Sequence, residues 1–112
     1  MKEDVKISED GGILTVRICC EIDHHTAKPL RERIDRALFE KKPHSLVLDF
    51  SEVSFMDSSG LGLIMGRYTL MKKLGGITVL LDPSEAIMRI VSLAGLERIV
   101  KIERTKIGRE AK

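Results

Sequence analysis

The chain has 112 residues, of which 43% are hydrophobic and 32% charged, and its formal net charge is +2 at pH 7. These values predict one folded domain over residues 1–112, exclude a disordered or fibrous chain, and give little electrostatic reason to expect nucleic-acid binding. The sequence has neither the apolar core of a signal peptide nor an apolar run of about 18 residues, so we expect a cytoplasmic protein without a membrane span.

The first elements expected along the chain are two strands, residues 5–7 and 13–20, joined by a hairpin turn at Asp10-Gly11-Gly12. Alternation in the second strand places its apolar face on the even-numbered residues. Cys19 and Cys20 end this strand. Because neighbouring strand residues point to opposite faces, we expect reduced, partly buried thiols and not a disulfide.

Helices and further strands alternate in the rest of the chain. Helices are predicted over residues 26–40, 59–74 and 84–94, and strands over 45–50, 77–81 and, briefly, near 99–102. In the second helix apolar residues recur at 61, 64, 65, 68 and 71, which predicts an inner stripe and leaves Arg67 pointing outward. The order ββαβαβα, with one last strand, predicts an α/β fold with a mixed, mostly parallel sheet, a core over about 5–102 and a charged tail at 103–112.

The segment from Phe55 to Gly62 is the most informative one, because an apolar stretch gives way there to a helix through Asp57-Ser58-Ser59-Gly60. A serine or aspartate at this point caps the free N–H groups of the first helical turn, and the same groups suit an added phosphate. Ordinary capping and an anion site both remain open, as does the choice between Ser58 and Ser59. The Gly-x-Ser-x-Gly elbow of a serine hydrolase is absent, so we do not expect an enzyme.

A second polar cluster lies at Glu21-Ile22-Asp23-His24-His25-Thr26, before the first helix. Asp23 or Thr26 is expected to cap that helix, with both histidines exposed. Adjacent histidines on a loop do not naturally face one ion, so no metal and no cofactor are predicted.

Three segments together resemble the STAS-domain anti-anti-sigma factors: residues 21–27, residues 54–62 and Gly66-Arg67-Tyr68. The resemblance covers about residues 5–102, and the Asp-His-His-Thr-Ala stretch with Gly-Arg-Tyr places it nearest the branch that antagonises the anti-sigma-F factor in sporulation.

The resemblance implies a partner-switching cycle. The unmodified protein would bind an anti-sigma factor that is also a serine kinase, freeing the sigma factor, and would be released once phosphorylated on Ser58. A metal-dependent, PP2C-like serine phosphatase would reset it. A monomer is expected, with partner contacts at Asp23, Asp57, Ser59, Gly60, Leu61 and Arg67. The alternative is a STAS-type module that binds a nucleotide or another anion at the same helix start.

Overall fold

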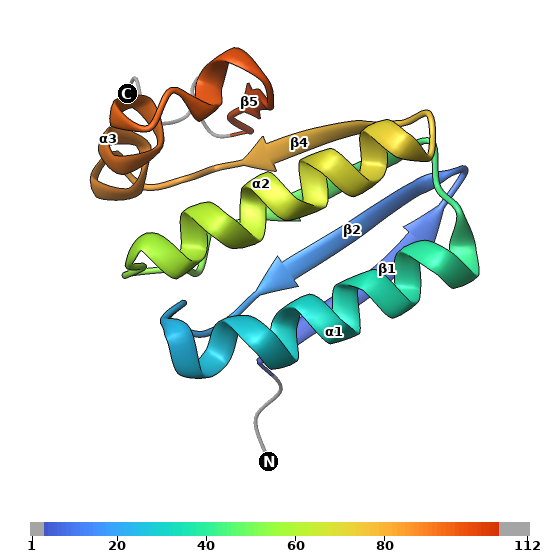
Figure 1. Cartoon of the computed structure of the whole chain (residues 1–112), viewed down its shortest axis with the longest axis horizontal. Coiled ribbons are helices and arrows are strands. Elements are labelled where there is room, and N and C mark those ends of the chain that lie inside the picture. The colour runs from blue at the N-terminus through green and yellow to red at the C-terminus, as the bar shows by residue number, and fades with distance from the viewer. Residues whose placement is uncertain (1–3, 106–112) are drawn as a thin grey trace.

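The computed structural model describes residues 4–105, which form one five-stranded sheet with helices packed on it (Figure 1). The strands lie side by side in chain order; β1 and β2 are antiparallel and every other neighbouring pair is parallel. The predicted mixed, mostly parallel sheet is therefore confirmed. The strand bounds are β1 Val5–Asp10, β2 Ile13–Ile18, β3 Ser45–Asp49, β4 Ile77–Leu81 and β5 Lys101–Glu103.

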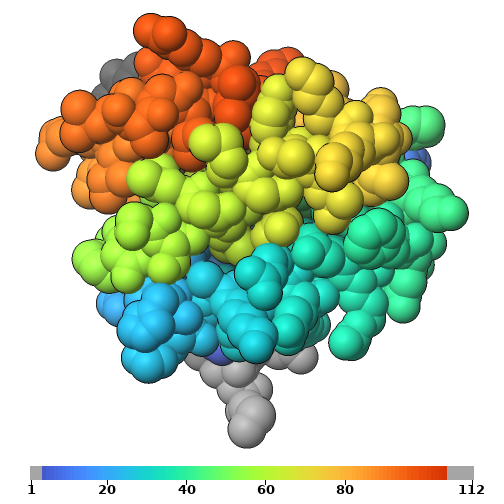
Figure 2. Space-filling model, viewed as in Figure 1, coloured from blue at the N-terminus to red at the C-terminus, as the bar shows by residue number. Residues whose placement is uncertain are grey.

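A helical segment connects each parallel pair of strands, as crossovers between parallel neighbours require. The bounds are α1 His24–Lys41, α2 Ser58–Lys73 and α3 Glu85–Leu93, with a short 3₁₀ helix, η1, at Leu96–Arg98. Helices α1 and α2 lie over the same face of the sheet (Figure 1), and their side chains meet side by side on the surface shown in Figure 2. No helix within residues 4–105 combines the length and hydropathy needed to cross a membrane.

The core lies between this sheet face and the two helices. Leu14, Val16 and Ile18 of β2 are fully buried, which confirms the even-numbered face predicted from alternation. Each such side chain contributes roughly 1.5–3 kcal/mol when removed from water. Neighbouring residues of β2, β3 and β4 line up across the sheet in two rows of this core layer. The rows are Leu14–Leu46–Thr78 and Val16–Leu48–Leu80.

The structure corrects the inner face predicted for α2. Its buried residues are Gly60, Leu63, Ile64, Arg67 and Met71, whereas Met65, placed in the predicted stripe, is 45% exposed. Ile64 and Met71 of the predicted stripe are buried, and Leu61 and Tyr68 pack against the core, so the predicted stripe was wrong in including Met65 and in omitting Leu63. This helix is apolar on most sides, so hydrophobicity alone did not single out the side that packs.

The C-terminal part differs in detail from the prediction. Residues 96–98 form the 3₁₀ helix η1, which the sequence did not reveal, so that β5 begins at Lys101, two residues later than expected. In α3, Ile87 and Val91 are buried as predicted, but Ala94 is exposed at the helix end. Of the predicted charged tail, residues 106–112 lie outside the described part of the chain.

Candidate functional site

Two loops at the carboxyl ends of β2 and β3 meet in the structure and place the starts of α1 and α2 together. Ile22 and Met56 form an isolated parallel bridge between the loops. The backbone N–H of Ile22 donates to the Phe55 carbonyl (3.0 Å), and the N–H of Asp57 donates to the Ile22 carbonyl (3.0 Å). These bonds join the two segments that sequence reasoning had singled out separately.

Asp23 is the N-cap of α1. Its Oδ1 accepts hydrogen bonds from the backbone N–H groups of His25 (2.9 Å) and Thr26 (3.0 Å), while Thr26 Oγ1 accepts from the Asp23 N–H (3.0 Å). The Thr26 backbone bond is the main reason that the pKa of Asp23 lies below its ordinary value of 3.8; desolvation opposes it and the His25 N–H adds to it. The prediction that Asp23 or Thr26 caps this helix is confirmed, although the helix begins at His24 instead of residue 26.

Asp57 caps α2 in the same way, because its Oδ1 accepts from the Ser59 backbone N–H at 2.7 Å. The next two serines differ in exposure: Ser58 is exposed, whereas Ser59 is half-buried. Among residues 4–105, the Ser58 hydroxyl has no hydrogen-bond partner. Capping by Asp57 and a free, accessible hydroxyl on Ser58 thus coexist at one helix start.

Gly60 and Leu61 occupy different surroundings in the first turn of α2. Gly60 is buried, and a Cβ atom added there would lie 2.5 Å from the Met56 sulfur, so only glycine lets the helix approach the bridged loop this closely. Leu61 is half-buried against the core. Phe55, the first residue of the segment that the sequence singled out, is 50% exposed and adds an apolar surface to the loop.

Arg67 does not point outward, and that expectation was wrong. The residue is 6% exposed and lies between α2 and α1, with its Nε 2.9 Å from Asp35 Oδ1. Burial lowers the pKa of Arg67, the Asp35 carboxylate raises it and the nearby Arg31 lowers it further. No local pattern signals this, because the partner Asp35 lies on a different helix.

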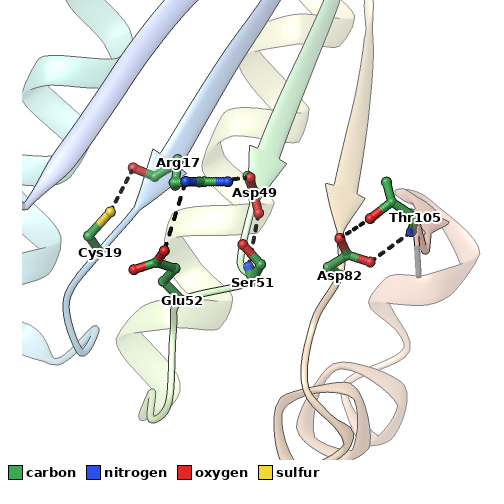
Figure 3. Close-up of polar contacts among 7 residues, drawn as sticks. All are labelled: Arg17, Cys19, Asp49, Ser51, Glu52, Asp82 and Thr105. Carbon is green, nitrogen blue, oxygen red and sulfur yellow. Dashed lines mark hydrogen bonds and ion pairs between the residues drawn. The ribbon is translucent and has the colours of Figure 1, made fainter. Parts of the chain in front are cut away.

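A polar cluster missed from the sequence supports the loop after β3 (Figure 3). Asp49 is buried and accepts from Arg17 Nε at 3.2 Å and from the Ser51 backbone N–H at 2.9 Å. Arg17 also lies 3.8 Å from Glu52. The sequence contained one signal of this cluster. Asp49 ends an otherwise apolar strand, and Arg17 lies on the polar, odd-numbered face of the neighbouring strand.

Within residues 4–105 no histidine hydrogen-bonds to the Ser58 hydroxyl, and no group of three or more His, Cys, Asp or Glu side chains is placed to hold a metal ion. His24 and His25 are exposed as predicted, and their rings pack on each other at 4.0 Å. The two cysteines are free, half-buried thiols, also as predicted. Chemically, the site offers a hydroxyl group at a helix start that suits an anion.

Comparison with known proteins identifies relatives over nearly the whole chain. Residues 4–106 match the STAS domain family. The sequence is 35% identical over 102 residues to an anti-sigma F factor antagonist of Paenibacillus polymyxa, covering 91% of this chain and 87% of that protein. It is 32% identical over 108 residues to the anti-sigma-B factor antagonist of Bacillus subtilis, covering 96% and 97%.

Among solved structures, the fold matches the anti-sigma factor antagonist SpoIIAA in two forms, each 27% identical to this chain. The unphosphorylated form gives a TM-score of 0.79, with 96% of this chain and 92% of that chain covered. The phosphorylated form, from Bacillus, gives 0.71, with 96% and 97% covered.

Proposed function

This chain belongs to the STAS domain family, and from that membership we propose that it is an anti-sigma factor antagonist, which binds an anti-sigma factor and thereby frees the sigma factor held by it. The names of the Paenibacillus polymyxa and Bacillus subtilis relatives support this role. The chain acts as a binding module and a substrate of other enzymes, without catalysis of its own.

Phosphorylation of Ser58 switches the antagonist off in this proposal. The single observation that carries the assignment is the contrast in exposure at the start of α2: Ser58 is exposed with a free hydroxyl, whereas Ser59 is half-buried and its N–H is held by Asp57. A kinase can reach the first hydroxyl without unwinding the helix. The phosphorylated form of the related SpoIIAA supports a switch of this kind.

The charge of one phosphate is large enough to release a partner. Phosphorylation adds about 1.5 to 2 negative charges. At about 5 Å a unit-charge repulsion is worth roughly 1 kcal/mol in water and roughly 3 kcal/mol at an effective dielectric of about 20. Two charges facing an acidic group of the partner therefore weaken binding by roughly 2–6 kcal/mol. At 1.4 kcal/mol per tenfold this amounts to about 30-fold to about 10⁴-fold.

The docking surface is the area around the two bridged loops and the first turn of α2. Asp57 contributes a carboxylate directly before Ser58, Asp23 contributes one next to the bridge residue Ile22, and the half-exposed Phe55 supplies apolar contact area. Ser59, Gly60 and Leu61 follow in the same turn, where the absence of a side chain on Gly60 keeps the turn close to Met56. The bridge between Ile22 and Met56 holds all these groups in one surface.

The complete cycle needs two further proteins. An anti-sigma factor with serine-kinase activity transfers the phosphoryl group from ATP, and a PP2C-like serine phosphatase removes it. We place the cycle in the cytoplasm, with the antagonist as a monomer, and in the control of sporulation-specific transcription, because the Paenibacillus polymyxa relative is named for the anti-sigma F factor.

Incubation with the anti-sigma F factor of Paenibacillus polymyxa and Mg-ATP, followed by intact mass measurement, tests the proposal. The wild-type chain is expected to gain the mass of one phosphoryl group, and peptide mapping is expected to place it on Ser58. Ser58→Ala should remain unmodified and stay bound to the kinase, whereas the matched variant Ser59→Ala should still accept phosphate.

A phosphate on Ser59 or Thr26 would contradict the assignment of the acceptor. Calorimetry with nucleotides separates the alternative function: tight binding of a nucleotide to the isolated chain, with no complex formed with the kinase, would identify an anion-binding module and refute the antagonist role.

A further inference from the structure

Arg67 and Asp35 form a buried link between the two helices that carry the proposed docking residues. Arg67 is the one basic side chain of residues 4–105 that is buried, and its Nε lies 2.9 Å from Asp35 Oδ1. The Asp35 side chain is 26% exposed, so the pair lies at the inner edge of the contact between α1 and α2. The helices meet side by side on this face (Figure 2).

The pair is poorly suited to stabilise the fold. Its closest atoms lack the angle of a good hydrogen bond, and Arg67 Nη1 has no hydrogen-bond partner among the described residues. Arg31 adds repulsion, and desolvation opposes the charge of Arg67. Removing two charges from water usually offsets their attraction unless every donor is paired, so apolar side chains of similar size would hold the helices at least as strongly. What the pair adds is an attraction between one defined residue of α2 and one defined residue of α1, whereas apolar burial does not select particular partners.

The ion pair lies far along both helices from their capped starts. Asp35 follows the cap Asp23 by twelve residues and Arg67 follows the cap Asp57 by ten, so at about 1.5 Å per residue the link lies roughly 18 Å and 15 Å from the two caps. At the other end the Ile22–Met56 bridge holds the helix starts together. Both helices also pack on the sheet through buried apolar side chains. The bridge and the ion pair add two specific attachments at different points along the helices, and together they favour one alignment of α2 against α1.

We propose that the Arg67–Asp35 ion pair is a positioning element that fixes the alignment of α2 against α1, and thereby the placement of Ser58 relative to Asp23. The functional consequence of this ion pair rests on the proposed function. A partner that contacts both Ser58 and Asp23 meets these two residues at one spacing and in one orientation. Neither Arg67 nor Asp35 touches the partner, so Arg67 acts through the geometry of the docking surface.

The test replaces the pair by apolar side chains, Asp35→Leu with Arg67→Met, in the full chain. The unfolding midpoint in urea is expected to stay at or above the wild-type value. Residual dipolar couplings of backbone amides should nevertheless report a changed or averaged orientation between α1 and α2. With the anti-sigma F factor of Paenibacillus polymyxa as the kinase, kcat/KM for phosphorylation should fall by about 10- to 100-fold, since small misplacements of reacting groups have effects of that size.

Two controls separate positioning from ordinary stability. Arg31→Met removes a neighbouring charge without breaking the pair, and should leave helix orientation and kcat/KM unchanged. Arg67→Lys keeps a cation opposite Asp35, and should therefore retain most of the wild-type helix orientation and most of the wild-type kcat/KM. If the double apolar variant does not fold, Asp35→Asn, at a half-buried position, takes its place. It leaves Arg67 buried without a counter-charge, so its unfolding midpoint should fall, while the expected changes in helix orientation and in kcat/KM stay the same.

An unchanged interhelical orientation in the folded apolar variant, or in Asp35→Asn where the apolar variant does not fold, would overturn the inference. So would an unchanged kcat/KM where the orientation does change. If the kinase fails to phosphorylate the wild-type chain, that result counts against the proposed function, and the dipolar couplings alone then decide the role of the pair.

Discussion

Replacing Gly60 by alanine places a methyl group where Met56 already lies. The new Cβ would be 2.5 Å from Met56 Sδ, 2.9 Å from its Cβ and 3.0 Å from its Cγ. Met56 is 2% exposed and its Cβ is fixed by the backbone, so it has little room to move. Overpacking of this kind typically costs about 1–3 kcal/mol. Alanine in place of glycine inside a helix gains about 1 kcal/mol, which leaves a net loss of up to about 2 kcal/mol.

Gly62 offers a matched control two residues along the same helix. A Cβ added there meets no atom within 4 Å, so Gly62→Ala gains helix propensity without a clash. The propensity gain largely cancels between the two variants. The difference in their free energies of unfolding, about 1–3 kcal/mol in favour of Gly62→Ala, therefore measures the contact with Met56 alone.

Urea denaturation followed by circular dichroism measures this difference, provided that both variants unfold with similar m-values. In the Met56→Ala background the penalty at Gly60 should shrink without vanishing, because the contacts with Sδ and Cγ disappear while the Cβ at 2.9 Å remains. Equal stability of Gly60→Ala and Gly62→Ala would refute the reasoning and mean that the first turn of α2 does not depend on close approach to the bridged loop.

Three further outcomes follow from the capping and polar contacts. Folding lowers the pKa of Asp23 below 3.8, so the ionised carboxylate stabilises the fold above that pH, and this stabilisation is lost as the pH falls through the folded pKa. Asp23→Asn should abolish this contribution to the acid dependence of thermal unfolding curves. Asp49→Ala leaves Arg17 and the Ser51 N–H without their acceptor and should cost about 1–2 kcal/mol in urea denaturation, more than Asp49→Asn, which keeps an oxygen for Ser51. Ser58→Asp should unfold near the wild-type midpoint yet bind the kinase weakly in calorimetry, and a large loss of stability would contradict the surface switch.

Features with a local cause could be predicted from the sequence. Alternation along β2 identified the buried Leu14, Val16 and Ile18 because a strand places successive side chains on opposite faces. Short polar side chains before apolar runs identified the helix starts, since a cap bonds to N–H groups only two or three residues away. Asp23 and Asp57 both serve as such caps.

Features that depend on distant parts of the chain could not be predicted in this way. No local pattern indicates that Arg67 is buried, because its partner Asp35 is thirty-two positions earlier and belongs to another helix. The bridge between Ile22 and Met56 likewise joins residues that only the parallel arrangement of β2 and β3 brings together. The predicted phosphoacceptor depended on family resemblance, and the structure supplies a physical reason to prefer Ser58 in its exposure.

Because Ser58 is exposed, a phosphate added there would affect the stability of the free chain and the stability of the complex to different extents. In the free chain the phosphate gains about 0.3–1 kcal/mol from the helix start and, with about 1.5 to 2 charges, loses roughly 1.5–2 kcal/mol to Asp57 through water at about 5 Å. The net cost of roughly 1 kcal/mol is small against an unfolding free energy of about 5–15 kcal/mol, so the fold tolerates the modification. When a partner excludes water from the same surface, the effective dielectric falls, so the excess of repulsion over attraction grows several-fold and the phosphate also loses its hydration. A phosphate on Ser58 would therefore destabilise the complex and leave the chain folded, as the proposed reversible switch requires.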